Sequence, residues 1–458
     1  MDAYKIIIVG ALLLALLPAV ILGSRGLKWG MLVWVATLAL GYRTFSITPK
    51  VLIHPAEVVI YGLCLWLLVQ RLSKRGASDS SPWVPLWLWP FALAWIWGWW
   101  PIVYGDVRWG AMLSEFKNVF LILPLFTLTS VVVKDRHSWR SIILVFYCAG
   151  LWIACFGILE YVYPGIKDWL PNFFTNPSHI KEEGFQRAAF SFWGSPDAVY
   201  MCLLALPFGL CIWQWWRSSW ARAINAVGML CLLYAAYLSG HRNSWLVIGV
   251  QVCLVVLVKR KYYVFGIVLF AFVLWGYKYL PDQARTRIYS GAQLIAGKPL
   301  DDDSSGQGRW NRTTASWNHV IERPLGGGWA AAGWVHNDFL QIAENLGLAV
   351  GLFFLAAYLF TFQRLLRQVL AMLKAGDPPW FLISVFLSYL AAGVVFATDA
   401  NLPLTQHIAP LWFIWTTSEI LMKQTRPELA PVTNAFSNLS APAYLQLRDG
   451  RARNVGIS

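Results

Sequence analysis

The chain has 458 residues, of which 58% are apolar and only 13% are charged, and it contains 28 Trp. An average soluble domain carries about 25% charged residues. This composition therefore excludes a soluble globular fold, and the amount of apolar surface excludes disorder. The net charge is +14, from 37 Lys and Arg against 23 Asp and Glu. On a chain that crosses a membrane many times, such an excess orients the spans rather than binding nucleic acid. We expect an integral membrane protein.

A membrane-spanning helix needs about 20 apolar residues. Thirteen runs approach this length: 4–23, 28–42, 52–70, 84–103, 117–133, 141–163, 197–216, 222–239, 244–258, 262–280, 343–362, 380–398 and 406–422. The first run lacks a strongly basic start, and a further basic and apolar stretch follows it, so we interpret it as a retained span and not a cleaved signal peptide. The run 28–42 is short and contains two glycines. The prediction is an all-α polytopic protein with about 12 transmembrane helices.

Basic clusters follow alternate spans and predict the orientation of the chain. They lie at 71–75, 134–140, 217–222, 259–261 and 364–374, and the tail after 423 continues the alternation. The positive-inside rule assigns these clusters to the cytoplasm. The loops 164–196 and 281–342 then lie on the opposite, outer face, and both exceed ordinary connector length. We expect a single transmembrane domain over 1–423 and a polar cytoplasmic tail over 424–458.

The second long loop contains a predicted helix from Gly308 to Glu322. Its apolar residues recur at spacings of three and four, which is the pattern of an amphipathic helix: Trp310, Thr313, Trp317, Val320 and Ile321. Such a helix lies either against the membrane face or against the helix bundle.

Motifs of soluble enzymes are missing from the sequence, including phosphate-binding glycine loops and the HExxH zinc motif. The seven cysteines all lie in apolar runs without a CxxC pair, so they indicate neither disulfides nor a thiolate metal site. The run Asp301-Asp302-Asp303 has the spacing that some metal-dependent sugar transferases use, but its Ser and Gly neighbours are typical of a solvated loop. We expect no metal and no cofactor.

Five cationic or titratable residues are predicted on the outer face, where topology does not explain them: Arg187, Arg242, Arg309, Arg312 and His336. Arg309 and Arg312 are three residues apart and share one side of the predicted helix. Arginine binds phosphate groups bidentately and stays charged, so the arginines suit a pyrophosphate. A histidine among them suits general-base work near neutral pH. Asp399, at the outer end of a span, is a further candidate for pairing with an arginine or orienting an acceptor.

These residues lie in segments that resemble a known family. Residues 305–309 read Ser-Gly-Gln-Gly-Arg, Trp317 follows, and 322–328 read Glu-Arg-Pro-Leu-Gly-Gly-Gly. The stretch 336–347 begins His-Asn-Asp and ends Glu-Asn-Leu-Gly, and a Ser-Gly-His-Arg hairpin occupies 239–242. This series resembles the O-antigen ligase and polymerase superfamily of bacterial inner-membrane glycosyltransferases. Arg187 with Gly194 and Pro196 is similar to an Arg, Gly, Pro-Asn element of the family, but Asp197 stands where the family usually has Asn. In the hairpin, Gly240 and His241 separate the serine from its arginine.

The resemblance implies a metal-independent, inverting transfer of a glycan from an undecaprenyl-pyrophosphate carrier on the periplasmic side. It implies that His336 is the base and that the pyrophosphate is held by Arg187, Arg242, Arg309 and Arg312. Asp399 and Asn337 are secondary candidates for the same site. The ligase reading, with the lipid A-core as acceptor, is favoured. An O-antigen polymerase and a protein O-oligosaccharyltransferase differ in acceptor and remain alternatives. A transporter of lipid-linked glycans is the non-enzyme alternative. A transporter should have polar residues at mid-membrane depth, whereas these spans are nearly uniformly apolar. The expected partners are the lipid-linked donor, the acceptor and membrane lipids.

Overall fold

We analysed a computed structural model of the chain. The structure describes residues 24–39, 45–48, 51–73, 83–104, 109–133, 136–163, 198–258, 304–333, 335–374, 379–399 and 405–424, together with 17, 21, 166, 285, 289 and 401. These residues are almost wholly helical, as the apolar runs predict. Besides loops, they include one short antiparallel pair of strands, β1 (Phe45–Thr48) with β2 (Val51–Ile53), whose β-branched and aromatic residues suit a strand.

The helices of the first half are α2 (Ser24–Thr37), α3 (Pro55–Ser73), α4 (Leu88–Trp97), the 3₁₀ helix η1 (Trp100–Tyr104), α5 (Trp109–Phe120), α6 (Ile122–Val132) and α7 (Arg136–Val162). Those of the second half are α9 (Val199–Ala205), α10 (Phe208–Trp215), α11 (Ser219–Leu238), α12 (Arg242–Val258), α15 (Ser304–Glu322), α16 (Asp338–Leu346), α17 (Leu348–Lys374), α18 (Trp380–Thr398) and α19 (Thr405–Gln424).

Within the described residues, six helical stretches are long and apolar enough to cross a membrane. They are Pro55–Ser73, Trp109–Val132, Ser138–Val162, Ser219–Leu238, Leu348–Lys374 and Trp380–Thr398. Each overlaps one of the apolar runs in the sequence, which supports a polytopic membrane protein. The count of twelve spans stays a prediction, and the proposed tail after 424 lies outside the described residues.

Three apolar runs form different elements from the continuous helices that the sequence predicts. The run 84–103 contains the ten-residue α4 and then η1, because Pro101 has no amide to continue a helix. The run 197–216 is divided into α9 and α10 next to Pro207. The run 343–362 is cut at Gly347, whose φ of 104° ends α16 and lets the chain turn into α17.

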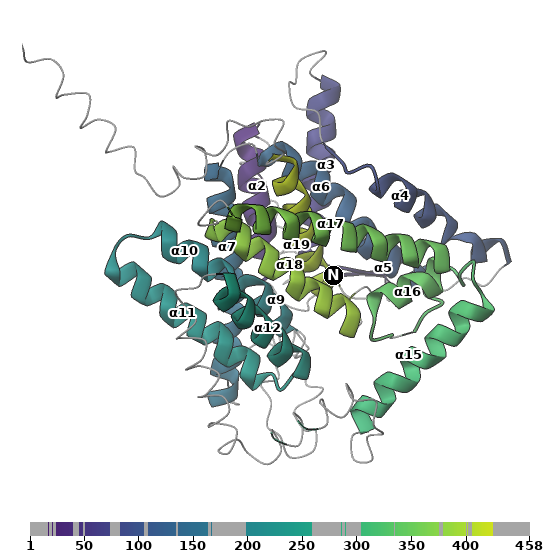
Figure 1. Cartoon of the computed structure of the whole chain (residues 1–458). Coiled ribbons are helices and arrows are strands. Elements are labelled where there is room, and N and C mark those ends of the chain that lie inside the picture. Colours follow the sequence, from purple (N-terminus) through teal and green to yellow (C-terminus); the bar gives the residue numbers. More distant parts are fainter. Residues whose placement is uncertain are drawn as a thin grey trace, which may run out of the picture.

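The core lies around α18 and α19, which occupy the middle of the bundle (Figure 1). Helix α18 contacts α9, α10, α12, α16 and α17, and α19 packs on α6. Aromatic rings fill the centre; Trp412 and Trp415 are wholly buried, and Phe354 of α17 packs against both. The tryptophan-rich α4 segment contributes Trp87, which stacks on Trp415 with ring centroids 4.9 Å apart. This core fixes the end of α18, where the candidate site lies.

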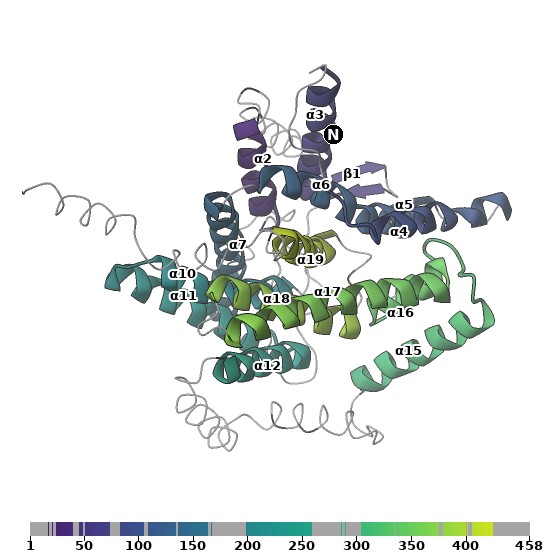
Figure 2. The ribbon, with the colours of Figure 1, turned by 45° about the horizontal axis from the view of Figure 1, so that its top comes forward.

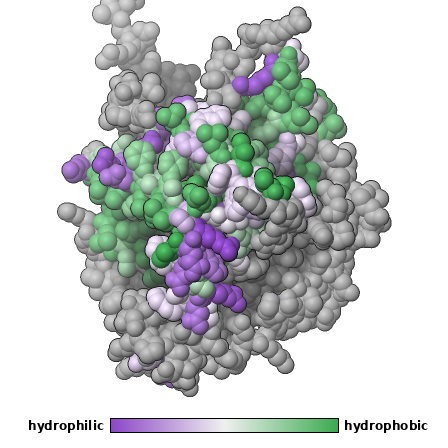
Figure 3. All heavy atoms as spheres, turned by 90° about the vertical axis from the view of Figure 1, so that its right-hand side faces the viewer, coloured by the Kyte–Doolittle hydropathy of each residue, from purple (hydrophilic) through white to green (hydrophobic). Residues whose placement is uncertain are grey.

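Helix α15 lies at the edge of the molecule beside α16, as two views show (Figures 1 and 2). It confirms the helix predicted over 308–322 and begins four residues earlier, at Ser304. Val320 is buried, whereas Trp310, Trp317 and Ile321 are exposed. The predicted apolar stripe is therefore mostly uncovered by the bundle. On this side of the molecule, hydrophobic surface occupies the upper part of the view and hydrophilic surface gathers below it (Figure 3).

Candidate functional site

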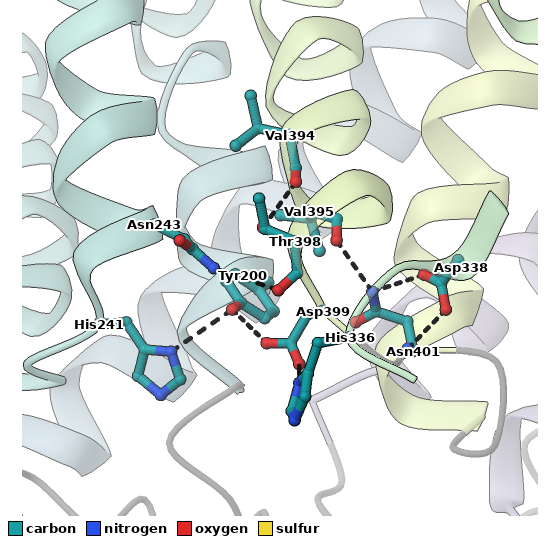
Figure 4. Close-up of polar contacts among 10 residues, drawn as sticks. All are labelled: Tyr200, His241, Asn243, His336, Asp338, Val394, Val395, Thr398, Asp399 and Asn401. Carbon is teal, nitrogen blue, oxygen red and sulfur yellow. Dashed lines mark hydrogen bonds and ion pairs between the residues drawn. The ribbon is translucent and has the colours of Figure 1, made fainter. Parts of the chain in front are cut away.

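Four segments far apart in the sequence meet around Asp399, at the C-terminal end of α18 (Figure 4). Tyr200 comes from the first turn of α9, and His241 from the tight turn between α11 and α12. His336 comes from the loop that leads into α16. The turn at His241 depends on Gly240, whose φ of 66° is one that L side chains rarely adopt. The helical framework thus gathers two histidines, one tyrosine and one carboxylate.

Asp399 is the centre of this group. One carboxylate oxygen, Oδ1, lies 3.2 Å from His336 Nδ1, and the other, Oδ2, accepts a short hydrogen bond from the hydroxyl of Tyr200. The Tyr200 hydroxyl also lies 3.4 Å from His241 Nδ1. Asp399 is 4% exposed, whereas the His336 side chain is 18% exposed. The carboxylate is therefore shielded, and the imidazole of His336 retains access to the outside of the bundle.

The surroundings of Asp399 keep it ionised. Burial by itself raises the pKa of a carboxyl group, because it penalises the charged form. The hydrogen bond with His336, the charges of Arg309 and His241 and the hydrogen bond from Tyr200 outweigh burial and hold the pKa of Asp399 well below its usual range. An ionised carboxylate only accepts hydrogen bonds. In its neutral form, His336 therefore donates from Nδ1 to this carboxylate, which leaves the other ring nitrogen, Nε2, as the acceptor.

A second polar pair runs beside the first. The buried carboxylate of Asp338 accepts from Asn401 twice, at 2.8 Å from the backbone amide to Oδ1 and at 2.7 Å from the side-chain amide to Oδ2. Asp338 is two residues after His336, and Asn401 is two residues after Asp399. The same two segments are thus joined at two neighbouring points, and the Asp338–Asn401 pair holds His336 in register with Asp399. Asn337 caps α16, because its side-chain oxygen accepts from the amide of Leu340 at 3.0 Å.

The buried carboxylate of Glu115 on α5 anchors the loop before His336. This carboxylate accepts three hydrogen bonds, from the amide of Ala330 at 2.9 Å, from Asn345 Nδ2 at 2.6 Å and from Gln341 Nε2 at 3.1 Å. Ala330 has a φ of 61°, a conformation that is uncommon for a residue with a side chain. Glu115 therefore fixes both the loop and α16, the two elements that flank His336.

Close backbone packing at Gly326 tightens the same loop. Gly326 has a φ of 86°, and a Cβ built on it would lie 2.5 Å from the amide nitrogen of Gly347. The next two amides along the chain, of Gly327 and Gly328, donate to the last turn of α16 at 2.8 Å each. The glycines of the Pro-Leu-Gly-Gly-Gly sequence thus allow the backbone of this loop to pack directly against the backbone at the end of α16.

Helix α15 is attached to α16 by one carboxylate. Glu344 accepts from the hydroxyl of Ser316 and lies 3.0 Å from His319 Nδ1. This attachment holds the half-buried Arg309 where its charge acts on Asp399. Arg312, one turn further along α15, is exposed.

The structure thus brings His336, Asp399 and the charge of Arg309 together among the residues predicted from sequence. Arg187 lies outside the described residues. Arg242 is the first residue of α12, directly after His241, and is described only by that position. The run 301–303 also lies outside the described residues. Where the structure describes the chain, no three His, Cys, Asp or Glu side chains gather as metal ligands would.

Sequence reasoning missed Tyr200, His241, Asp338, Asn401 and Glu115. His241 carried a usable signal, because it adjoins Arg242 in the hairpin that was already singled out. Tyr200 carried none, since a tyrosine in an apolar run has the same pattern as a packing residue.

The chain was compared with known proteins, and it matches no family model and no curated protein.

Proposed function

We propose that the protein is a membrane-bound glycosyltransferase in which His336 is the general base. The observation that carries this proposal is the buried, ionised Asp399 at 3.2 Å from His336 Nδ1. A carboxylate that fixes one ring nitrogen of a histidine orients the ring and stabilises the imidazolium that forms when the other nitrogen takes a proton.

The proposed reaction has one displacement step. Nε2 of His336 removes the proton from an acceptor hydroxyl while the hydroxyl oxygen attacks the anomeric carbon of a lipid-linked sugar. A new C–O bond forms, the bond from the anomeric carbon to the pyrophosphate breaks, and its electron pair leaves with the pyrophosphate. The leaving group is already a stable anion, so the step needs no acid, metal or cofactor. Attack from the opposite side inverts the anomeric centre.

The proposed role of arginine is to bind that leaving anion. Arg309 is half-buried on α15 and its charge reaches Asp399, so it lies close enough to act on a group that reacts at His336. Preorganised cations stabilise the negative charge that builds up on a leaving phosphate. Arg187, Arg242 and Arg312 complete the proposed pyrophosphate site.

In its finer form, the proposal is an O-antigen ligase of the bacterial inner membrane with its site open to the periplasm. The donor is an undecaprenyl-pyrophosphate-linked glycan and the acceptor is the lipid A-core. This form is supported by the motif series around 305–347, which contains His336, by the contact of His336 with Asp399, and by the apolar helices that suit a membrane.

The test is complementation of a ligase-deficient bacterial strain. Capped lipopolysaccharide ladders support the ligase, restored chain length alone indicates a polymerase, and a glycan-shifted secreted protein indicates a protein transferase. We expect His336→Ala and Arg242→Ala to abolish transfer while the protein remains inserted in the membrane. His137→Ala serves as the matched control, because His137 lies in the first turn of α7 and is not part of the proposed site. Normal banding from the His336→Ala strain would overturn the general-base role.

A further inference from the structure

The Tyr200 hydroxyl lies between Asp399 and a second histidine, His241. Its side chain comes from α9, which packs on α7, α11, α12 and α18. Tyr200 is 2% exposed and His241 is 8% exposed, and their rings meet edge to face with centroids 5.8 Å apart. The hydroxyl bonds the carboxylate oxygen that His336 does not use. Both oxygens of Asp399 therefore have a partner, one on each side (Figure 4).

The chemistry of the groups sets the direction of these hydrogen bonds. An ionised carboxylate accepts, so Tyr200 donates its only proton to Oδ2 of Asp399. The tyrosine oxygen then accepts, and His241 must be the donor from Nδ1. The bonds run from His241 to Tyr200 to Asp399, and from His336 to Asp399. In this arrangement His336 presents Nδ1–H to the carboxylate itself, whereas His241 presents Nδ1–H to the hydroxyl of Tyr200.

We propose that Tyr200 is a positioning residue for the base His336, and that His241 in turn holds Tyr200. The proposal rests on the proposed function, because it takes His336 as the group that accepts the proton. Tyr200 acts through Asp399 in two ways. It stops the carboxylate from rotating, and it takes part of the negative charge that would otherwise act more strongly on His336.

Charge sharing has a measurable consequence. Among the described residues, four charged or titratable groups act on Asp399: His336 from the loop before α16, Arg309 from α15, His241 from the α11–α12 turn and Tyr200 from α9. Without the Tyr200 hydroxyl, the carboxylate concentrates its charge on His336 and binds the proton of the imidazolium more tightly. A base that holds its proton more tightly is blocked at higher pH. Removal of the hydroxyl therefore moves the acid side of the pH profile toward neutrality.

The experiment compares Tyr200→Phe with wild type in proteoliposomes, with a purified undecaprenyl-pyrophosphate-linked glycan and a lipid A-core acceptor. We expect kcat to fall about tenfold, KM to stay within about twofold, and the acid limb of kcat to move up by at least about half a pH unit. His241→Ala gives the same direction with a smaller change, since its bond is longer and one step removed. Tyr237→Phe is the matched control, because it removes a hydroxyl from a ring that stacks on Trp245 of the same hairpin. An unchanged pH profile in Tyr200→Phe would overturn the proposal.

A second measurement works without any transfer reaction. Nitrogen NMR of ¹⁵N-histidine-labelled protein reports the tautomer of each ring, and His336→Gln and His241→Gln identify the two signals. We expect both rings to carry the proton on Nδ1, and the His336 signal to shift in Tyr200→Phe and not in Tyr237→Phe. If wild type transfers no glycan but these signals behave as expected, the proposed function fails while the hydrogen-bond arrangement stands. A proton on Nε2 of His336 in wild type refutes the arrangement itself.

Discussion

The Asp338–Asn401 pair offers a direct test of how the site is held together. The substitution Asn401→Ala removes the 2.7 Å bond from the side-chain amide to Asp338 Oδ2 and a longer one, 3.3 Å, from the same amide to the carbonyl of Val395. It leaves the 2.8 Å backbone bond to Asp338 in place. A hydrogen bond to a charged group contributes about 1.5–3 kcal/mol. We therefore expect Asn401→Ala to lower the free energy of unfolding by about 2 kcal/mol. Asp338→Ala removes both bonds and costs about 3–6 kcal/mol, less the relief of no longer burying a carboxylate.

We expect Asn401→Ala to lower the rate of glycan transfer, kcat, more than it changes the KM for the substrates. Asn401 is two residues from Asp399, and a displacement of about 1 Å between catalytic groups costs up to about 100-fold in rate. We expect kcat of Asn401→Ala to fall 10- to 100-fold with KM within about twofold. The assays are thermal unfolding of purified protein in detergent and transfer in proteoliposomes. Asn243→Ala is the control, because its amide lies 3.5 Å from the carbonyl of Thr398, which is too long to contribute much.

A double-mutant cycle isolates the pair. If Asp338 and Asn401 act together, the double variant loses less stability than the two single losses combined, with a coupling energy of about 0.5–3 kcal/mol. Wild-type unfolding and wild-type kcat in Asn401→Ala would show that the pair does not hold His336 in register, and the reasoning would be refuted.

Two further predictions concern the glycine-rich loop and metal dependence. Gly326→Ala should lower the melting temperature strongly and abolish transfer, because its Cβ would meet the backbone of Gly347 at 2.5 Å in a left-handed conformation; Gly249→Ala, with nothing within 4 Å, should be neutral or slightly stabilising. Equal melting temperatures for the two variants would show that the loop is not held by backbone contact. Transfer should survive EDTA, and a loss that added divalent cation restores would revive a metal site at 301–303.

The sequence predicted the helices best where an apolar run was long and unbroken. The run 380–398 corresponds to α18, and 141–163 corresponds to most of α7. The prediction was wrong where proline or glycine interrupts a helix, as in 84–103 and 343–362. An apolar run indicates that a segment is buried, but it does not indicate whether the helical hydrogen bonds continue along it. The interruptions were visible as Pro101 and Gly347, but neither residue by itself tells whether a helix bends, breaks or continues.

The site was only partly predictable for a similar reason. His336 and Asp399 stood out because each is a polar residue at the end of an apolar run. Their contact across 63 residues was not visible, since nothing in a single sequence specifies which span ends lie side by side. Tyr200 and Asn401 became recognisable only when the fold placed them against those carboxylates.

The arrangement around Asp399 also bears on how the protein is made. The histidines and the tyrosine precede residue 337, whereas the carboxylate that organises them belongs to the last part of α18. A chain emerging from the ribosome therefore contains the proposed base long before its partner. In an incompletely inserted chain, His336 lacks the charge that orients it. A histidine of this kind reaches its final orientation only when nearly the whole bundle has assembled.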